Sequence, residues 1–252
     1  MKLAKSLVML CAVLVAALAL AGCGGDSDVL RVGTEATFPP FEYTDEDDNI
    51  IGFDIDIINW IAEDNDWEIE VTHLPFDTLV ESLAADQLDI VIAAMTIRPD
   101  RAEQVLFSDP YYDASQVMVV RDDETRRFGV DDIVDQDLIV AVQMGTTGAF
   151  EAEDILGAED HPNLKQYRRA NEAFMELKNG RVDLVIIDEP VALNYIAQLG
   201  GMKVHGEPFT DEQFGIAVQL ENTEMMDKIN ASLAKMVNSG EYDRLFKLWF
   251  ED

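Results

Sequence analysis

The chain has 252 residues, of which 18 are Lys or Arg and 50 are Asp or Glu, and its formal net charge is −32. A protein that holds nucleic acid or an anionic membrane by electrostatics needs a basic face, so this balance argues against both classes. An acidic surplus favours solubility but says little about the fold.

Residues 1–23 have the pattern of a secretory signal rather than of a folded segment. Lys2 and Lys5 form a short basic region, residues 7–20 are almost wholly apolar, and small residues follow. The apolar stretch is too short for a comfortable permanent membrane helix. It ends in "LAGC", residues 20–23, which resembles the lipobox of bacterial and archaeal lipoproteins, and we therefore expect Cys23 to carry a lipid anchor.

The alternative is an ordinary signal peptide that is cleaved nearby, with Cys23 incidental.

Residues 24–28, "GGDSD", follow Cys23 and are predicted to form a flexible polar tether. Cys11 is lost with the signal, so we expect the exported domain to contain no disulfide. Its stability must come from core burial in one or two lobes.

From residue 29 onward, short apolar runs alternate with amphipathic helical patterns. The first set predicts strands at residues 30–34, 68–74 and 88–95 and helices at residues 53–65 and 76–86. Asp54 and Asp77 are the expected caps of these helices. The continuous apolar run 88–95 is typical of a parallel strand that is covered on both faces. Such alternation indicates an α/β fold.

A second set follows the segment "YYDASQVMVV". It predicts strands at residues 137–143 and 182–187, a glycine turn leading into a helix at residues 145–156, and a helix at residues 171–180 between Asn171 and Gly180. The C-terminal residues 223–250 read as two helices broken near Ser239 and Gly240. The segments "LVESLAADQLDIVIAAMTI" and "FMELKNGRVDLVIIDEPV" form a weak internal repeat, consistent with two similar lobes.

Three predicted strands end in polar groups of complementary type. In open α/β sheets, small ligands bind at the carboxyl ends of strands. These ends carry Thr96 with Arg101, then Gly145, Thr146 and Thr147 at the start of a helix, and then Asp188. A guanidinium and a helix N-terminus would bind a carboxylate, and an acid would bind an ammonium. The combination predicts a zwitterionic ligand.

Taken singly, these residues have plainer interpretations. Arg101 would pair with Asp100 or Glu103 at the surface, and Asp188 would be a helix cap. The three histidines lie far apart in sequence and no cysteine accompanies them, so we expect neither a metal site nor a cofactor. The set of two anion-binding features and one acid favours the binding site.

Five stretches in order resemble the family 3 solute-binding proteins of ABC transporters for polar amino acids. They are "GTEATFPPFEY", "GFDIDI", "MTIRPDRAEQVLFSDPYY", "VQMGTTGAF" and "GRVDLVIIDEPVA". The resemblance covers nearly the whole chain after the signal. It implies a two-lobed periplasmic-binding-protein fold of type II, in which each lobe has a mixed, mostly parallel sheet flanked by helices.

The resemblance also implies how the chain divides. Residues 29–115 and 215–252 would form lobe 1, and residues 116–214 would form lobe 2. The two crossings between the lobes should fall near residues 113–116 and 212–215.

The family's ligand residues match positions in this chain. Arg101 matches the arginine that clamps the ligand carboxylate, and Thr96 matches a hydroxyl donor beside it. Thr147, in the turn with Thr146, matches the residue whose backbone meets the same carboxylate from the other lobe. Asp188 matches the acceptor for the α-ammonium.

Other matched positions concern the ligand side chain. Phe38 and Phe76 match aromatic walls, Glu35 matches a nearby acid, and Gln143 lies where members vary with specificity. Ala94 departs from the family, because several members have a small polar residue there that contacts the ammonium. Arg98 matches no ligand residue, and we read it as a surface residue.

The implied function is capture of a polar amino acid by hinge closure and its delivery to the permease and ATPase of an ABC importer, by a monomer without enzymatic activity, outside the cytoplasm. Glu35 and two aromatic walls favour a basic ligand, arginine above lysine or histidine. Glutamine or another uncharged polar amino acid is the alternative. An enzyme of the cyclohexadienyl dehydratase kind would use Glu35 or Asp188 as a general acid, and a receptor sensor domain would need a further segment after Phe250.

Overall fold

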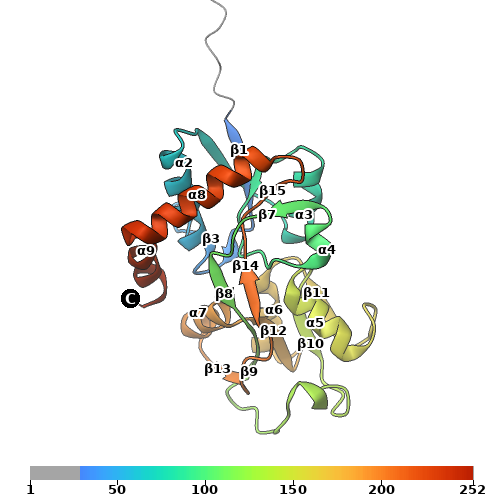
Figure 1. Ribbon diagram of the computed structural model, residues 1–252. Coiled ribbons are helices and arrows are strands. Elements are labelled where there is room, and N and C mark those ends of the chain that lie inside the picture. Colours follow the sequence, from blue (N-terminus) through green and yellow to red (C-terminus); the bar gives the residue numbers. More distant parts are fainter. Residues whose placement is uncertain (1–28, 252) are drawn as a thin grey trace, which may run out of the picture.

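The computed structural model describes residues 29–251 (Figure 1), so the lipobox and the tether lie outside the described residues. The first lobe is built on a five-stranded sheet with the order β5-β1-β6-β15-β7. Its strands are β1 (Leu30–Thr34), β5 (Ile69–His73), β6 (Ile90–Val91), β7 (Val105–Phe107) and β15 (Ala217–Gln219). β1 is parallel to β5 and β6, whereas β15 is antiparallel to β6 and β7.

The second lobe repeats this arrangement with the strand order β11-β10-β12-β9-β13. Its strands are β9 (Gln116–Arg121), β10 (Val140–Gln143), β11 (Leu164–Tyr167), β12 (Leu184–Asp188) and β13 (Met202–His205). β10 is parallel to β11 and β12, and β9 is antiparallel to β12 and β13. The predicted two-lobed α/β fold with mixed, mostly parallel sheets is therefore confirmed.

Two smaller sheets complete the strands. β2 (Thr37–Phe38), β3 (Glu42–Thr44) and β4 (Ile50–Ile51) form an antiparallel meander in the first lobe. β8 (Tyr112–Ala114) and β14 (Glu212–Phe214) form an antiparallel ribbon between the two large sheets. Because this ribbon belongs to neither large sheet, the lobe boundaries at residues 115 and 215 stay a prediction.

Helices cover both sheets (Figure 1). They are α2 (Phe53–Asp64), α3 (Phe76–Ala84), α4 (Pro99–Ala102), α5 (Thr147–Leu156), α6 (Ala170–Lys178), α7 (Glu189–Leu199), α8 (Thr223–Ser239), α9 (Glu241–Phe250) and the 3-10 turn η1 (Val130–Asp132). The predicted C-terminal break is confirmed, since Gly240 has a φ of 79° between α8 and α9. Within residues 29–251, no helix is long and apolar enough to cross a membrane.

Three predicted helix caps are wrong. α2 and α3 begin at Phe53 and Phe76, one residue before Asp54 and Asp77, because each helix starts with a buried aromatic ring. α6 likewise begins at Ala170, which is fully buried, so Asn171 lies inside the helix. Burial of the first apolar side chain outweighs the local preference for a polar cap.

The predicted strand 88–95 is also wrong in extent. Only Ile90 and Val91 belong to β6, although the whole segment from Ile90 to Met95 is buried. Ala94 adopts a φ of 44°, a left-handed backbone that is uncommon for a residue with a Cβ. The chain therefore leaves the sheet after Val91 and turns toward the gap between the lobes, where the candidate site lies.

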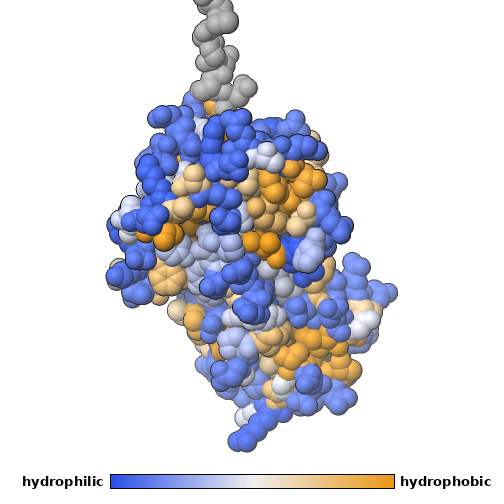
Figure 2. Space-filling model, in the orientation of Figure 1, coloured by the Kyte–Doolittle hydropathy of each residue, from blue (hydrophilic) through white to orange (hydrophobic). Residues whose placement is uncertain are grey.

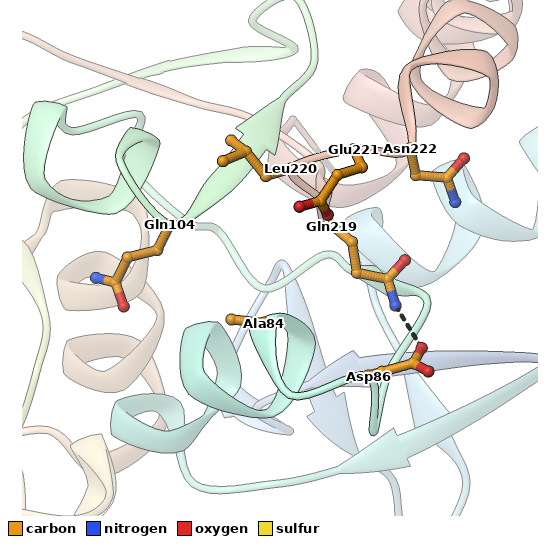
Figure 3. A pocket seen from close by; sticks show the side chains of 7 residues that line it. All are labelled: Ala84, Asp86, Gln104, Gln219, Leu220, Glu221 and Asn222. Carbon is orange, nitrogen blue, oxygen red and sulfur yellow. Dashed lines mark hydrogen bonds between the residues drawn. The ribbon is translucent and has the colours of Figure 1, made fainter.

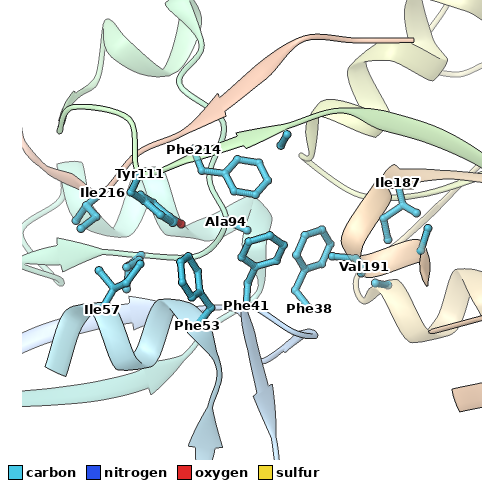
Figure 4. Close-up of a cluster of buried hydrophobic side chains, with 14 of the residues drawn as sticks. Phe38, Phe41, Phe53, Ile57, Ala94, Tyr111, Ile187, Val191, Phe214 and Ile216 are labelled. Atoms are coloured by element: carbon cyan, nitrogen blue, oxygen red, sulfur yellow. The ribbon is translucent and has the colours of Figure 1, made fainter. Parts of the chain in front are cut away.

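Aromatic rings contribute to the cores of both lobes. Figure 4 shows rings of the first lobe, among which Phe41, Phe53, Tyr111 and Phe214 pack together. Phe41 makes edge-on contacts with Phe53 and Phe214, with ring centroids 6.3 and 5.3 Å apart. In the second lobe Phe174 on α6 stacks on Tyr195 on α7, whereas the cluster beneath β10 and α5 is mostly aliphatic.

Candidate ligand-binding site

A small, nearly filled cavity lies between the lobes, at the carboxyl ends of their strands. Its lining residues are Phe38, Phe76, Ala94, Thr96, Arg101, Thr146, Thr147 and Asp188. The room left inside it for water-sized spheres is only about 10 Å³, whereas small-molecule pockets start at about 300 Å³, so the lobes must move apart to admit an amino acid. The structure brings eight of the residues singled out in the sequence to one place.

Arg101 is the cation of the cavity. It lies on α4, is only 5% exposed, and donates from Nη1 to the Thr96 carbonyl at 2.8 Å and from Nη2 to the Gly145 carbonyl of the second lobe at 3.0 Å. Its guanidinium carbon lies 5.2 Å from the centroid of the Phe76 ring. Burial lowers the pKa of Arg101 to about 10, which still leaves it charged at neutral pH.

Asp188 is the acid that lines the cavity from the second lobe. It ends β12 and precedes α7, yet its side chain caps no helix N–H. Its Oδ1 atom is buried and has no hydrogen-bond partner among the described residues. Burial, followed by the charge of Glu212, raises the pKa of Asp188 to about 8. The side chain of Gln116, opposite Asp188 on β9, opposes this pKa shift as a neutral donor, and the ammonium of a ligand would supply a charged one.

The N-terminus of α5 faces the first lobe. Thr146 caps the helix through its hydroxyl, which accepts from the Ala149 N–H. The first N–H groups of a helix have no intrahelical acceptor and form an anion-binding end. Gly145 permits the approach of the lobes, because a Cβ there would lie 3.0 and 3.1 Å from the Cβ and Cα atoms of Asp77.

Thr96 links this helix to the ribbon between the lobes. The Thr147 hydroxyl donates to Thr96 Oγ1 at 2.9 Å, and the Thr96 hydroxyl donates to Glu212 Oε2 at 2.7 Å. Thr210 donates to the other oxygen of Glu212. The single hydroxyl proton of Thr96 is therefore directed at Glu212, whereas the family resemblance implies that it points at a ligand carboxylate.

Glu35 and Gln143 contact each other across the two lobes but are not among the lining residues of the cavity. Gln143 Nε2 donates to Glu35 Oε2 at 3.1 Å across the two lobes. The Thr37 hydroxyl donates to both Glu35 oxygens at 2.8 and 2.9 Å. Burial raises the pKa of Glu35, and these donors oppose the shift. Both residues would have to separate before a long ligand side chain could reach Glu35.

Two further contacts join the lobes outside the cavity. The guanidinium carbon of Arg98 lies 4.0 Å from the centroid of the Phe150 ring on α5. The Tyr195 hydroxyl on α7 donates to the Thr37 carbonyl at 2.8 Å. Arg98 is a partly exposed residue outside the cavity that also contacts the second lobe. The lobes are in a closed arrangement.

The wider hollows of the surface do not share these features. Figure 3 shows one on the first lobe, where Gln219 donates to Asp86 at 3.0 Å and the remaining lining residues are mostly exposed. Figure 2 shows a largely hydrophilic face with apolar patches on both lobes. Of the five cavities compared within residues 29–251, the small one between the lobes is the one lined by both a buried arginine and a buried acid.

Sequence reasoning missed three residues that shape the site. Glu212 holds Thr96, Phe150 receives Arg98, and Tyr195 reaches Thr37. Each contact joins segments that are more than 50 residues apart. No local pattern marks them. Only the position of Glu212 at a predicted crossing drew attention to that segment.

The comparisons with known proteins agree with this geometry. The sequence profile of the bacterial extracellular solute-binding proteins, family 3, matches residues 30–252. The chain therefore belongs to that family.

Three relatives illustrate the likeness. The probable histidine-binding protein of Neisseria gonorrhoeae is 34% identical, over 93% of this chain and 91% of the relative. An ancestral arginine-binding protein bound to arginine is 40% identical, with a TM-score of 0.82 over 88% of this chain and 98% of that structure. An ancestral arginine-binding protein bound to glutamine is also 40% identical, with a TM-score of 0.83 over 89% and 98% of the two chains.

Proposed function

We propose that this protein captures a free amino acid with a basic side chain by closing its two lobes, and delivers it to an ABC importer. The observation that carries the proposal is that Arg101 and Asp188 are both 5% exposed and line one cavity from different lobes. A ligand with a carboxylate and an ammonium neutralises both groups. Charge-assisted hydrogen bonds contribute about 1.5 to 3 kcal/mol each, and micromolar binding needs about 8 kcal/mol.

In this proposal the carboxylate lies between Arg101 and the N-terminus of α5, where Thr146 and Thr147 stand. The ammonium takes the place of the missing donor at Asp188 Oδ1. Phe38 and Phe76 enclose the aliphatic part of the ligand. Thr96 adds a contact from the first lobe, either through its backbone or after its hydroxyl turns away from Glu212.

The choice of a basic ligand rests on charge. Arg101 is the cation of the cavity, whereas Asp188, Glu212 and Glu35 are three acids at or beside it, each at most 7% exposed. A zwitterion adds no net charge to this surplus of acids, whereas a cationic side chain favours their ionised forms, which burial opposes in Asp188 and Glu35. The names of relatives that bind arginine or histidine point the same way.

Glutamine is the second candidate. Glu35 already has Gln143 and Thr37 as hydrogen-bond donors, so it has no need of a cation. A relative that is named for arginine has been solved with glutamine bound. An uncharged amide therefore fits the same end of the cavity.

A thermal-shift screen of the twenty amino acids, followed by calorimetry, tests the proposal. We expect the largest stabilisation from arginine, lysine or histidine. Agmatine lacks the carboxylate and 5-guanidinopentanoate lacks the ammonium, so neither should bind measurably. Stabilisation by glutamine alone would select the second candidate, and no response to any amino acid would reject both.

Two further parts of the proposal concern turnover and location. We propose binding without catalysis, and conversion of prephenate by the purified protein would contradict that. We also propose that Cys23 carries a lipid anchor outside the cytoplasmic membrane and that the protein acts as a monomer. Cys23→Ser should release the protein from the membrane fraction, and sedimentation should give the mass of one chain.

A further inference from the structure

Two carboxyl groups are buried together beside the cavity. Glu42 lies on β3 and Asp54 lies in the first turn of α2, and both side chains are 0% exposed. The Asp54 N–H donates to the carbonyl of Phe41, the residue before Glu42, at 2.9 Å, so the two acids stand beside each other. Neither of them lines the ligand cavity, so the proposed binding function does not account for them.

If Glu42 and Asp54 were both ionised, their carboxylate oxygens would outnumber the hydrogen-bond donors around them. Asp54 Oδ2 accepts from the Ala94 N–H and from the Tyr111 hydroxyl, each at 2.7 Å. Both oxygens of Glu42 and Oδ1 of Asp54 are then left without a donor among residues 29–251. Two carboxylates can only accept, so a hydrogen bond between them requires a proton.

The charges around Glu42 favour its protonated form. The charged groups that act on Glu42 in the described chain are acids, namely Asp54, Glu35 and Asp188, and Tyr111 and Tyr242 are the phenols nearby. Burial, with repulsion from Asp54, raises the pKa of Glu42 well above its usual range. The pKa of Asp54 rises only to about 6, because Ala94 and Tyr111 donate to it. Asp54 accepts two hydrogen bonds and Glu42 accepts none, so the charge belongs on Asp54 and the proton on Glu42.

The pair reaches the ligand site through one backbone group. Asp54 holds the N–H of Ala94, which lines the cavity and keeps a left-handed φ of 44°. Such a backbone is unfavourable for alanine and persists only where neighbours enforce it. Asp54 is the side chain that fixes this N–H, and Glu42 is the remaining donor that can satisfy Asp54 Oδ1.

We propose that Glu42 is a positioning residue that stays protonated, donates to Asp54, and thereby holds the backbone of Ala94 in the conformation that the bound amino acid requires. This inference rests on the proposed function only where it concerns affinity. The shared proton and the held amide are properties of the ligand-free protein as well.

Two substitutions of Glu42 test whether its hydrogen-bond donor, rather than its side-chain volume, determines the affinity for the ligand. Glu42→Gln keeps a donor toward Asp54, and we expect its affinity for the amino acid found in the screen to stay within about threefold of wild type. Glu42→Leu keeps the bulk but leaves Asp54 Oδ1 unpaired, and an unpaired buried acceptor predicts a loss of about 5- to 100-fold. Glu46→Leu, at an exposed position on the same meander, is the matched control. Equal affinities of the Gln and Leu variants would overturn the proposal.

The pH profile separates positioning from mere stability. A Glu42 that keeps its proton should leave the ratio of the wild-type affinity to the Glu42→Gln affinity constant through the ordinary range of a glutamate, about pH 4.3, and through neutral pH. The ratio of the two affinities cancels the titration of the ligand itself. A ratio that falls as the pH rises through that ordinary range would contradict a proton on Glu42.

A measurement on the ligand-free protein determines the protonation state of Glu42 directly. With ¹³C-labelled glutamate carboxyls, the signal that disappears in Glu42→Gln should stay at its protonated shift through neutral pH. A signal that titrates near the ordinary value of about 4.3 would overturn the inference, even if amino acid binding is found. Failure of every amino acid to bind would reject the proposed function and leave this measurement to decide the inference alone.

Discussion

The five-stranded sheets of the two lobes have the same pattern. Three neighbouring strands are parallel, the fourth is antiparallel to the third, and the fifth is antiparallel to the fourth. β1 occupies the same place in its sheet as β10, and β6 occupies the same place as β12. The ends of these four strands carry most of the candidate site. Glu35 follows β1 and Gln143 ends β10, whereas Arg101 follows β6 and Asp188 ends β12.

Equivalent strand ends thus carry complementary groups. Glu35 accepts a hydrogen bond from Gln143, and the guanidinium of Arg101 shares a cavity with the carboxylate of Asp188. Because the two lobes have the same strand arrangement, equivalent strand ends face each other across the gap between the lobes. The residues at these ends differ between the lobes, so the two sides of the site are complementary. The difference between the lobes, rather than their likeness, therefore makes the site.

The lobes also differ in how their site residues are held. Arg101 and Ala94 stand on the lobe in which a buried carboxyl pair fixes a backbone amide. Asp188 and Thr147 stand on the other lobe, which reaches the first through a few hydrogen bonds. We expect ligand to dock on the first lobe before the second closes, as in other hinge-closing binding proteins.

The largest effect should come from the cation of the first lobe. Arg101→Ala leaves the ligand carboxylate desolvated and without its charge partner, which predicts a loss of affinity of at least about 100-fold. Arg244→Ala, which removes an exposed arginine on α9, should leave affinity unchanged. Calorimetry on both variants provides the comparison, and binding by Arg101→Ala within threefold of wild type would remove the carboxylate assignment.

The acid of the second lobe should have the next largest effect, with a signature in pH. Its folded pKa of about 8 lies above the ordinary value, so its proton stabilises the ligand-free closed protein at low pH, and that stability is lost as pH rises through about 8. Asp188→Asn cannot titrate. The midpoint of unfolding of the wild type should therefore fall relative to that of Asp188→Asn between about pH 5 and about pH 9.

The same variant should weaken ligand binding by about 10- to 100-fold, because an amide satisfies an ammonium less well than a carboxylate does. Asp227→Asn, at an exposed position on α8, is the control for both measurements. Parallel unfolding curves for Asp188→Asn and wild type at every pH would show that Asp188 is not buried as described.

Much of this arrangement is readable from sequence, because periodicity and strand ends are local features. The apolar strands and the polar residues that follow them mark β6, β10 and β12 and the groups Thr96, Thr147 and Asp188. Helix starts are less readable, since Phe53 and Phe76 enter the core one residue before the polar caps that the pattern favours.

Contacts between distant segments cannot be read from such patterns. Glu42 and Asp54 are two acids among fifty, and nothing local shows that both are buried. Arg98 and Arg101 stand three residues apart on one short segment, yet one enters the cavity and the other stacks on Phe150. Their different fates depend on how the second lobe closes, which is a property of the whole fold.

The pair at the ends of β1 and β10 should control ligand choice. Glu35→Gln removes the acid but keeps the volume, and its affinity for arginine should fall about tenfold more than its affinity for glutamine, because only the cation loses a charge partner. Each ligand serves as the control for the other in the same protein. Equal losses for both ligands in calorimetry would show that Glu35 acts only through its contact with Gln143.

The smallest expected effect concerns the contact between lobes outside the cavity. Phe150→Leu keeps an apolar side chain on α5 but removes the ring under Arg98, and an exposed cation-π contact contributes about 0.5 to 1 kcal/mol. Because neither residue lines the cavity, the variant should raise the ligand dissociation rate about two- to fivefold and leave the association rate unchanged. Arg98→Met should have the same effect, and the double variant should add nothing further. Additive effects in stopped-flow measurements would show that the two residues act separately, and that the closed state owes its stability to the cavity alone.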